Sequence, residues 1–216
     1  MSNTSLAEIL SKYMPAPAVP ICTSWIVRLN IHLRITKSRA SKYGDYRPAR
    51  GTDAHIITVN HNLNQYSFLI TFIHEVAHLV CEKKYSRFAA PHGREWKHEY
   101  SALLNFFLLK NIFPADVEMA LRQYVKDPAA SSCTDENLLR VLKSYDRSEK
   151  EKVTFLEELP HGSLFRLNSS KLTFVKGHLM RKRFQCFEYS SRAEYRVSAL
   201  AEVTPLEAEQ PIASRQ

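Results

Sequence analysis

The sequence predicts an α+β protein, with a mainly helical core that contains a small β-sheet and a small β-rich subdomain after it. Three observations support this class: helical spacing of apolar residues between residues 64 and 107, a β-branched run before them, and four short apolar and aromatic runs between residues 164 and 197. We expect the core and its helical extension over residues 1–150, a basic β subdomain over 151–203, and a disordered tail over 204–216.

The first element predicted is a short amphipathic helix over residues 2–14. One side of this helix carries its apolar side chains, which are Leu6, Ile9, Leu10 and Tyr13. Three prolines follow at positions 15, 17 and 20, and they are expected to end the helix.

A strand followed by a long helix is predicted next. Residues 54–60 are rich in β-branched side chains, which is typical of a strand. Asn64 is a suitable N-cap, and no proline or glycine interrupts residues 52–90. The helix that follows has apolar residues at Tyr66, Leu69, Ile70, Ile73, Ala77 and Val80. After a break, a second helix is expected from the spacing of Trp96, Tyr100, Leu103, Leu104 and Phe107.

The remainder of the chain divides into a helical and a β-rich part. Residues 114–160 are predicted to be helical, with a loop at 127–135 after which Asp135 can cap the next helix. Four strands are then predicted, at residues 164–167, 172–175, 183–189 and 194–197.

The composition argues against several classes of protein. The four cysteines are scattered, which indicates a reducing compartment and not a disulfide framework. We expect a cytoplasmic protein with no membrane partner, because no secretory signal and no apolar run of spanning length is evident. Only five glycines are present and none forms a phosphate loop, so no nucleotide cofactor is expected. Cys133 has no predicted histidine partner, which gives a thiol nucleophile little support.

His74-Glu75-Val76-Ala77-His78 is the most informative segment of the chain. Residues four apart share one face of a helix, so both imidazoles point the same way and can hold one Zn²⁺ ion. Glu75 then stands beside the metal as a candidate general base. The competing interpretation is a buried helix with two incidental histidines.

A catalytic zinc ion needs a third protein ligand and an open position for water. His92 is the leading candidate, because the break after His78 allows the chain to turn back and present it at the mouth of the second helix. Glu95 and Glu99 rank second, since some zinc hydrolases use two histidines and a glutamate. His98 ranks last, because six residues along a helix turn it well away from His92.

These residues, together with Gly93 and Trp96, resemble the SprT-like (Spartan-type) metallopeptidase family over roughly residues 5–110. The upstream segments 31–35, 43–48 and 57–60 are also similar. The resemblance implies a zincin-like core, zinc on His74, His78 and His92, and Glu75 as catalytic acid and base. The best-known relatives cut proteins attached to DNA. Many members carry a C-terminal zinc ribbon, but this chain has no Cys-x-x-Cys pair, so its β subdomain is expected in the ribbon's place without the metal. A plain β extension that completes the core is an equal alternative.

The positive charge is concentrated in two segments. Residues 28–50 carry seven Lys and Arg against Asp45, and residues 161–200 carry eight against Glu188 and Glu194. Basic clusters with interleaved aromatic residues favour a polyanion such as DNA. The best candidate is Arg181-Lys182-Arg183, beside Phe184, Phe187 and Tyr189 on which bases could stack. Ordinary solvated charge is the competing interpretation.

The function expected from these patterns is zinc-dependent hydrolysis of peptide bonds, in proteins that include DNA-associated ones. The strand at residues 56–59 is expected to align the substrate backbone. Two alternatives stay open: a zinc-stabilised module that binds nucleic acid and cuts nothing, which a fourth ligand from Glu95 or Glu99 would favour, and a metal-free helical module.

Overall fold

The structure is a computed structural model that describes residues 3–39, 42–51, 53–85, 89–129, 135–146, 154–168 and 170–206. The chain divides into two compact units, Met1–Arg147 and Ser148–Gln216. Helices and strands are both abundant, which confirms the α+β class. No helix in the described part of the chain is long and apolar enough to cross a membrane.

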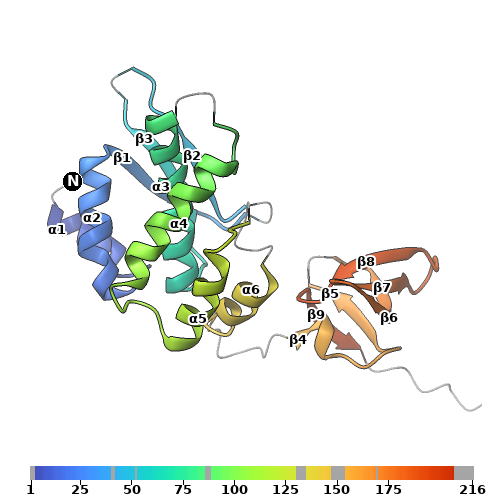
Figure 1. Cartoon of the computed structure of the whole chain (residues 1–216). Helices are drawn as coiled ribbons and strands as arrows, with labels where there is room; N and C mark the ends of the chain where they lie inside the picture. The colour runs from blue at the N-terminus through green and yellow to red at the C-terminus, as the bar shows by residue number, and fades with distance from the viewer. Residues whose placement is uncertain are drawn as a thin grey trace, which may run out of the picture. The chain divides into compact units, whose positions relative to one another are not determined.

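The first unit is built on a small mixed sheet (Figure 1). Its described strands are β1 (Ile31–Thr36), β2 (Gly44–Arg47) and β3 (His55–Asn60), in the order β1-β3-β2. The central strand β3 pairs in parallel with β1 along its whole length and antiparallel with β2 over residues 56–59. The prediction of a strand at residues 54–60 is therefore confirmed for His55–Asn60.

Helices surround this sheet and supply most of the buried core. They are α1 (Asn3–Leu10), α2 (Val19–Arg28), α3 (Gln65–Tyr85), α4 (Arg94–Leu108), α5 (Ala115–Tyr124) and α6 (Glu136–Lys143). Helix α3 packs on β2 and β3, α2 packs on β1, and α4 packs along α3. Helix α3 is the central element of the unit, since most of its residues from Ser67 to Cys81 are buried.

The two helix N-caps predicted from the sequence, Asn64 and Asp135, are present in the structure. The side chain of Asn64 accepts hydrogen bonds from the backbone N–H groups of Tyr66 and Ser67, at 3.1 and 2.9 Å, and the Asp135 carboxylate accepts one from Leu138 at 2.8 Å. Both predicted caps are confirmed, because each side chain satisfies an N–H group that the first helical turn leaves without a partner.

The prolines after α1 do more than end a helix. Pro17 lies in the short 3-10 helix η1 (Ala16–Ala18), and Pro20 lies in the first turn of α2. A proline is tolerated there because the first turn needs no N–H donor. No helix is predicted from the sequence at Val19–Arg28, so this element was missed.

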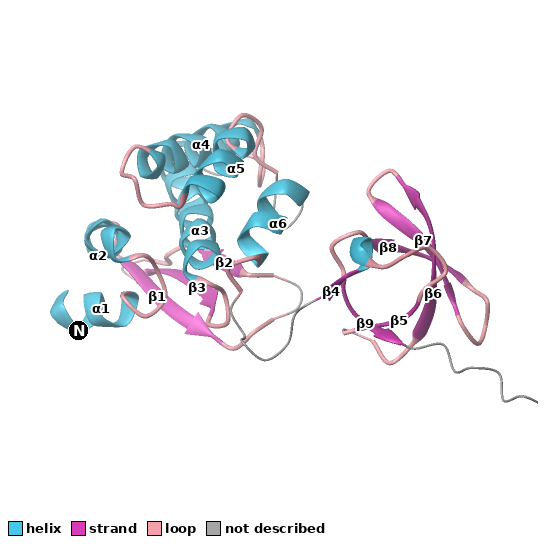
Figure 2. Ribbon diagram, turned by 90° about the horizontal axis from the view of Figure 1, so that it is seen from below, coloured by secondary structure: helices cyan, strands magenta, loops and turns pink. Residues whose placement is uncertain are grey.

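The second unit contains a sheet of six described strands in the order β4-β9-β5-β6-β7-β8, all paired antiparallel. Figure 2 shows that the sheet curves strongly around its buried side. The strands are β4 (Thr154–Phe155), β5 (Leu164–Leu167), β6 (Thr173–Met180), β7 (Arg183–Glu188), β8 (Glu194–Ser198) and β9 (Glu202–Leu206). Six buried residues form its core: Leu156, Phe165, Phe174, Cys186, Val197 and Val203.

The four predicted strands of this unit are present, but two predictions at its ends were wrong. Residues 154–158 were expected to be helical, whereas they form β4 and the 3-10 turn η4 (Leu156–Glu158). Residues 204–206 were assigned to a disordered tail, whereas they belong to β9, which pairs with both β4 and β5. Residues 207–216 lie outside the described part of the chain.

Candidate metal centre

Helix α3 brings His74 and His78 together, as a spacing of four residues requires. Their Nε2 atoms lie 3.2 Å apart, and both side chains are half-buried. The other side chains of this helical turn are buried, so the two half-buried imidazoles are the part of the turn that is accessible.

His92 completes the group from the loop before α4. Its Nε2 atom lies 3.0 Å from that of His78 and 3.2 Å from that of His74. The His92 backbone is in the left-handed region with φ of 58°, and Gly93 follows as the N-cap of α4. A residue other than glycine adopts this conformation at some cost, which the surrounding structure must offset. The turn places the imidazole over the α3 pair.

The spacing of the three nitrogens is compatible with a zinc site. Zinc–nitrogen bonds of 2.0–2.1 Å set the ligand nitrogens of a tetrahedral site roughly 3.3 Å apart. The three observed separations of 3.0–3.2 Å are close to this value. In the described part of the chain these three histidines are the one group of side chains with donor atoms close enough to share a metal ion.

The histidines are also held in the protonation state that a metal needs. Burial, with repulsion from the other two imidazoles, lowers the pKa of His74 to about 3. Burial and repulsion from His92 lower the pKa of His78 to about 4, and burial lowers the pKa of His92. All three therefore stay neutral at pH 7, with lone pairs free to coordinate.

The rival ligands are placed elsewhere. Glu99 is buried and accepts hydrogen bonds from Lys84 Nζ, at 2.8 and 2.9 Å, and from the Tyr85 hydroxyl at 3.0 Å. Its carboxylate links α3 to α4 and does not belong to the cluster of His74, His78 and His92. Neither Glu95 nor the exposed His98 belongs to that group. No fourth protein ligand is thus found among the described residues.

Trp96 packs against all three histidines of the candidate metal centre. From the sequence this residue was predicted only as part of the apolar face of a helix. Its ring centroid lies 4.7 Å from that of His74, 5.2 Å from that of His78 and 4.6 Å from that of His92. The indole is almost fully buried, and its N–H group has no hydrogen-bond partner among the described residues. One rigid aromatic ring therefore supports all three imidazoles.

Glu75 lies on the neighbouring face of α3, against the sheet. Its side chain is only 6 % exposed, and no described residue donates a hydrogen bond to it. Burial and the negative charge of Asp45 raise its pKa to about 8, against the weaker opposite effects of Lys42 and Arg39. A carboxyl group tuned in this way can take up and release protons near neutral pH.

Gly44 makes room for this carboxylate, a role that was not predicted from the sequence. A Cβ atom at position 44 would overlap Oε1 of Glu75 and come within 2.8 Å of Thr71 Cγ2. The first residue of β2 must therefore be glycine for the strand to pass so close to Glu75. The sequence offered one indication of this role, because the chain has only five glycines and one of them lies at position 44.

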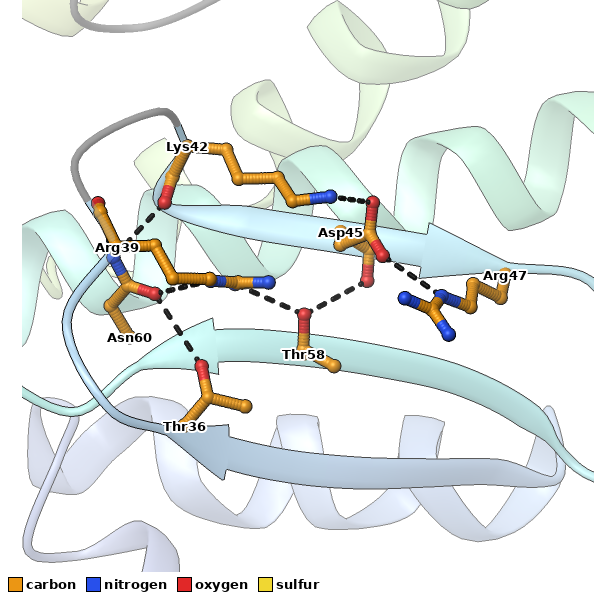
Figure 3. Close-up of polar contacts among 7 residues, drawn as sticks. All are labelled: Thr36, Arg39, Lys42, Asp45, Arg47, Thr58 and Asn60. Atoms are coloured by element: carbon orange, nitrogen blue, oxygen red, sulfur yellow. Dashed lines mark hydrogen bonds and ion pairs between the residues drawn. The ribbon is translucent and has the colours of Figure 1, made fainter.

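A polar network fixes the segment that leads into β2 (Figure 3). Asn60 Nδ2 donates to the carbonyl oxygens of Arg39 and Lys42, at 3.2 and 3.0 Å, and Asn60 Oδ1 accepts from Arg39 Nε at 2.9 Å. Asp45 on β2 accepts from Lys42 Nζ at 2.6 Å and from Arg47 Nε at 3.1 Å. These contacts anchor β2 where Gly44 lies against Glu75.

The strand expected to align a substrate is the wrong one. Residues 56–59 lie in β3, whose two edges are already occupied by β1 and β2. Strand β2 is at the edge of the sheet, and no described strand pairs with its outer side. An extended peptide could therefore add to β2 but not to β3.

The basic residues of the second unit lie at a hairpin. Arg181 and Lys182 form the turn between β6 and β7, Arg183 begins β7, and all three are exposed. Phe184 is not free for stacking, because the buried Lys176 ammonium lies 3.9 Å from the centre of its ring. Tyr189 is exposed, and the Arg192 guanidinium lies 5.7 Å from its ring centre.

Comparison with known proteins gave no relative. No protein-family model matches the chain, and no curated protein and no solved structure shows significant similarity to it.

Proposed function

We propose that this chain is a zinc-dependent peptidase with a zincin-like core. The observation that carries the proposal is the triangle of His74, His78 and His92 nitrogens, 3.0–3.2 Å apart, beside the buried carboxyl group of Glu75. Three protein ligands with no fourth among the described residues are typical of a catalytic zinc ion, whereas structural zinc takes four.

The three histidines would hold the metal through their Nε2 atoms. When bound, a zinc ion would supply a Lewis acid and a water of lowered pKa at this centre. Glu75 takes a proton from the attacking water and delivers it to the leaving amine. Trp96 packs against the imidazoles of His74 and His92, with ring centroids 4.7 and 4.6 Å away, and holds them in place.

The free edge of β2 suits the backbone of an extended peptide. Gly44 brings this strand against Glu75, so a peptide paired with β2 runs past the general base. A buried site beside an open strand edge favours a flexible polypeptide as the substrate over a small molecule.

The substrates we propose are proteins, with DNA-associated proteins as the leading class. Support comes from the resemblance of the His74–His78 and His92–Trp96 segments to SprT-like peptidases, and from the exposed residues Arg181, Lys182 and Arg183. Exposed cations on a hairpin can contact phosphate groups without sequence preference.

The experiment is a metal and activity analysis of the purified full chain. We expect one zinc ion per chain, cleavage of casein by the zinc-loaded protein, loss of cleavage with a chelator, and recovery when zinc is returned. A chain that takes up no zinc on titration would overturn the proposal. One that binds zinc tightly but cuts neither free nor DNA-bound proteins would favour the non-catalytic, nucleic-acid-binding alternative.

A further inference from the structure

A cavity of about 490 Å³ opens beside the candidate metal centre. His78 and Trp96, which both belong to that centre, line one side of it. Its volume is in the range of pockets that bind ligands in other proteins. A group held in this cavity would lie next to the reacting bond of a substrate.

Five of the residues that line the cavity are small alanines and prolines from two segments. Pro48 and Ala49 come from the segment after β2, and Ala89, Ala90 and Pro91 come from the segment before α4. Alanine and proline side chains leave the space between the two segments unfilled. Tyr46 and Trp96 add two large aromatic rings to the walls, and aromatic rings prefer offset or edge-on contact with another ring.

Two opposite charges also line the cavity, and they balance one another. Arg50 is exposed, and the Glu82 carboxylate accepts a hydrogen bond of 2.8 Å from the Tyr46 hydroxyl. An acidic occupant would be repelled by Glu82, and a basic occupant would be repelled by Arg50. Because each charge also attracts the occupant that the other repels, the pair gives the cavity no net preference for an acidic or a basic group.

We propose that this cavity is a specificity pocket for one large neutral side chain, aromatic in preference, of the polypeptide substrate. The proposal rests on the proposed peptidase function, since it places the occupant beside the bond to be cut. Pro48 and Ala49 follow directly after β2. A peptide that pairs with β2 and continues in the same direction therefore brings a side chain to the pocket.

The first test measures binding without hydrolysis, so it does not depend on activity. The two tryptophan indole signals of the ¹⁵N-labelled full-length Glu75→Gln protein are followed by NMR during titration with N-acetyl-L-phenylalaninamide. We expect the Trp96 signal to shift, and the Trp25 signal to stay, because Trp25 packs against Phe107 away from the pocket. N-acetyl-L-alaninamide should shift neither signal.

Matched alanine variants locate the binding site. Ala49→Leu and Ala90→Leu each fill the pocket and should abolish the Trp96 shift, whereas Ala102→Leu on the exposed side of α4 should preserve it. An unshifted Trp96 signal at saturating phenylalaninamide, or a shift that both filling variants retain, would overturn the proposal. A chain without peptidase activity that still gives the expected shifts would separate the pocket from the proposed function.

The second test reads specificity from cut sites. In a peptide library digested by the active protein, aromatic residues should be enriched on one fixed side of the cleaved bond. Glu82→Gln should raise cleavage next to acidic residues, and Arg50→Gln should raise cleavage next to basic residues, each by roughly 10-fold, the order of discrimination that one pocket contact gives. Unchanged profiles in both variants would count against the pocket.

Discussion

Each unit of the molecule contains a buried glutamate, and the pKa values of these two side chains are shifted in opposite directions. Glu188, at the end of β7, is 7 % exposed and accepts hydrogen bonds from the Ser190 and Ser191 backbone N–H groups and the Ser190 hydroxyl. These hydrogen bonds lower its pKa to about 2. Glu75, on α3, is 6 % exposed, lacks such donors among the described residues, and has its pKa raised to about 8.

The difference is between a carboxylate that is held in its charged form and a carboxyl group whose pKa lies near neutral pH. Glu188 is fixed in its charged form and organises the turn between β7 and β8, which is the usual outcome for a buried charge. Glu75 is kept close to the point of exchange between its two forms, beside the three histidines of the candidate metal centre. A carboxyl group whose pKa is raised in this way is a candidate for a chemical role, and that role is what we propose for Glu75.

The largest expected effect is on activity. Glu75→Gln keeps the size of the side chain but removes the proposed base, so zinc content should persist while the proposed peptidase activity falls by roughly 10²–10⁴-fold or more. Glu188→Gln is the matched control, and its activity should equal that of the unaltered protein. Activity that survives Glu75→Gln would assign the base to another residue.

The next effect separates the histidines. His92→Ala removes one of three ligands and should lower zinc affinity by more than the roughly 10–100-fold cost of losing an outer partner. His98→Ala removes an exposed imidazole outside the metal group and should leave affinity unchanged. Equilibrium titration against a competing chelator measures both. The reverse result would mean that the turn at His92 is assigned wrongly.

The contact that keeps Glu75 against β2 can be tested through stability. Gly44→Ala forces a methyl group against Glu75 and Thr71 and should cost roughly 1–3 kcal/mol, as overpacking does. In a Glu75→Ala background the same change should cost much less, because the main obstacle is gone. Denaturant unfolding of the four proteins gives the coupling. Additive costs would show that Gly44 and Glu75 do not touch.

The two glutamates should respond to pH in opposite senses in the metal-free protein. The folded-state pKa of Glu75 is raised from 4.5 to about 8, so the stability tied to its neutral form is lost as pH rises through about 8. Glu75→Gln should therefore raise the Tm by several degrees near pH 8 and little near pH 4.5.

Glu188 supplies the opposite case. Its folded-state pKa is lowered to about 2, so its stabilising effect is present above pH 4.5 and is lost as pH falls toward 2. Glu188→Gln should lower the Tm at neutral pH, and the loss should shrink in acid. Thermal melts from pH 2.5 to 8.5 check both variants, and parallel curves would contradict the contrast.

The smallest effect concerns the second unit alone. Replacing Arg181, Lys182 and Arg183 with glutamine should weaken DNA binding across sequences and flatten its salt dependence by roughly 0.7–0.9 for each phosphate that is no longer neutralised. Zinc content should not change. Fluorescence titrations at several salt concentrations measure the slope. Binding that the triple change leaves untouched would remove DNA as the partner of this hairpin.

Local patterns made α3 and its cap predictable. The spacing of His74 and His78, the cap at Asn64 and the apolar period all depend on residues within a few positions of one another. The strands at β5, β6, β7 and β8 were predictable for the same reason. Strands β4 and β9 were not, because β4 has two residues and β9 contains a proline, and both are defined by their partners.

By itself the sequence determined which residues could bind a metal and on which helix two of them lie, because helix geometry is local. Only the tertiary structure decided that β2 and not β3 lies at an edge of the described sheet, that Gly44 contacts Glu75, and that Glu99 pairs with Lys84. The cavity beside His78 is likewise seen only in the tertiary structure. Each of these depends on contacts between segments far apart in the chain, whose pairing no local pattern encodes.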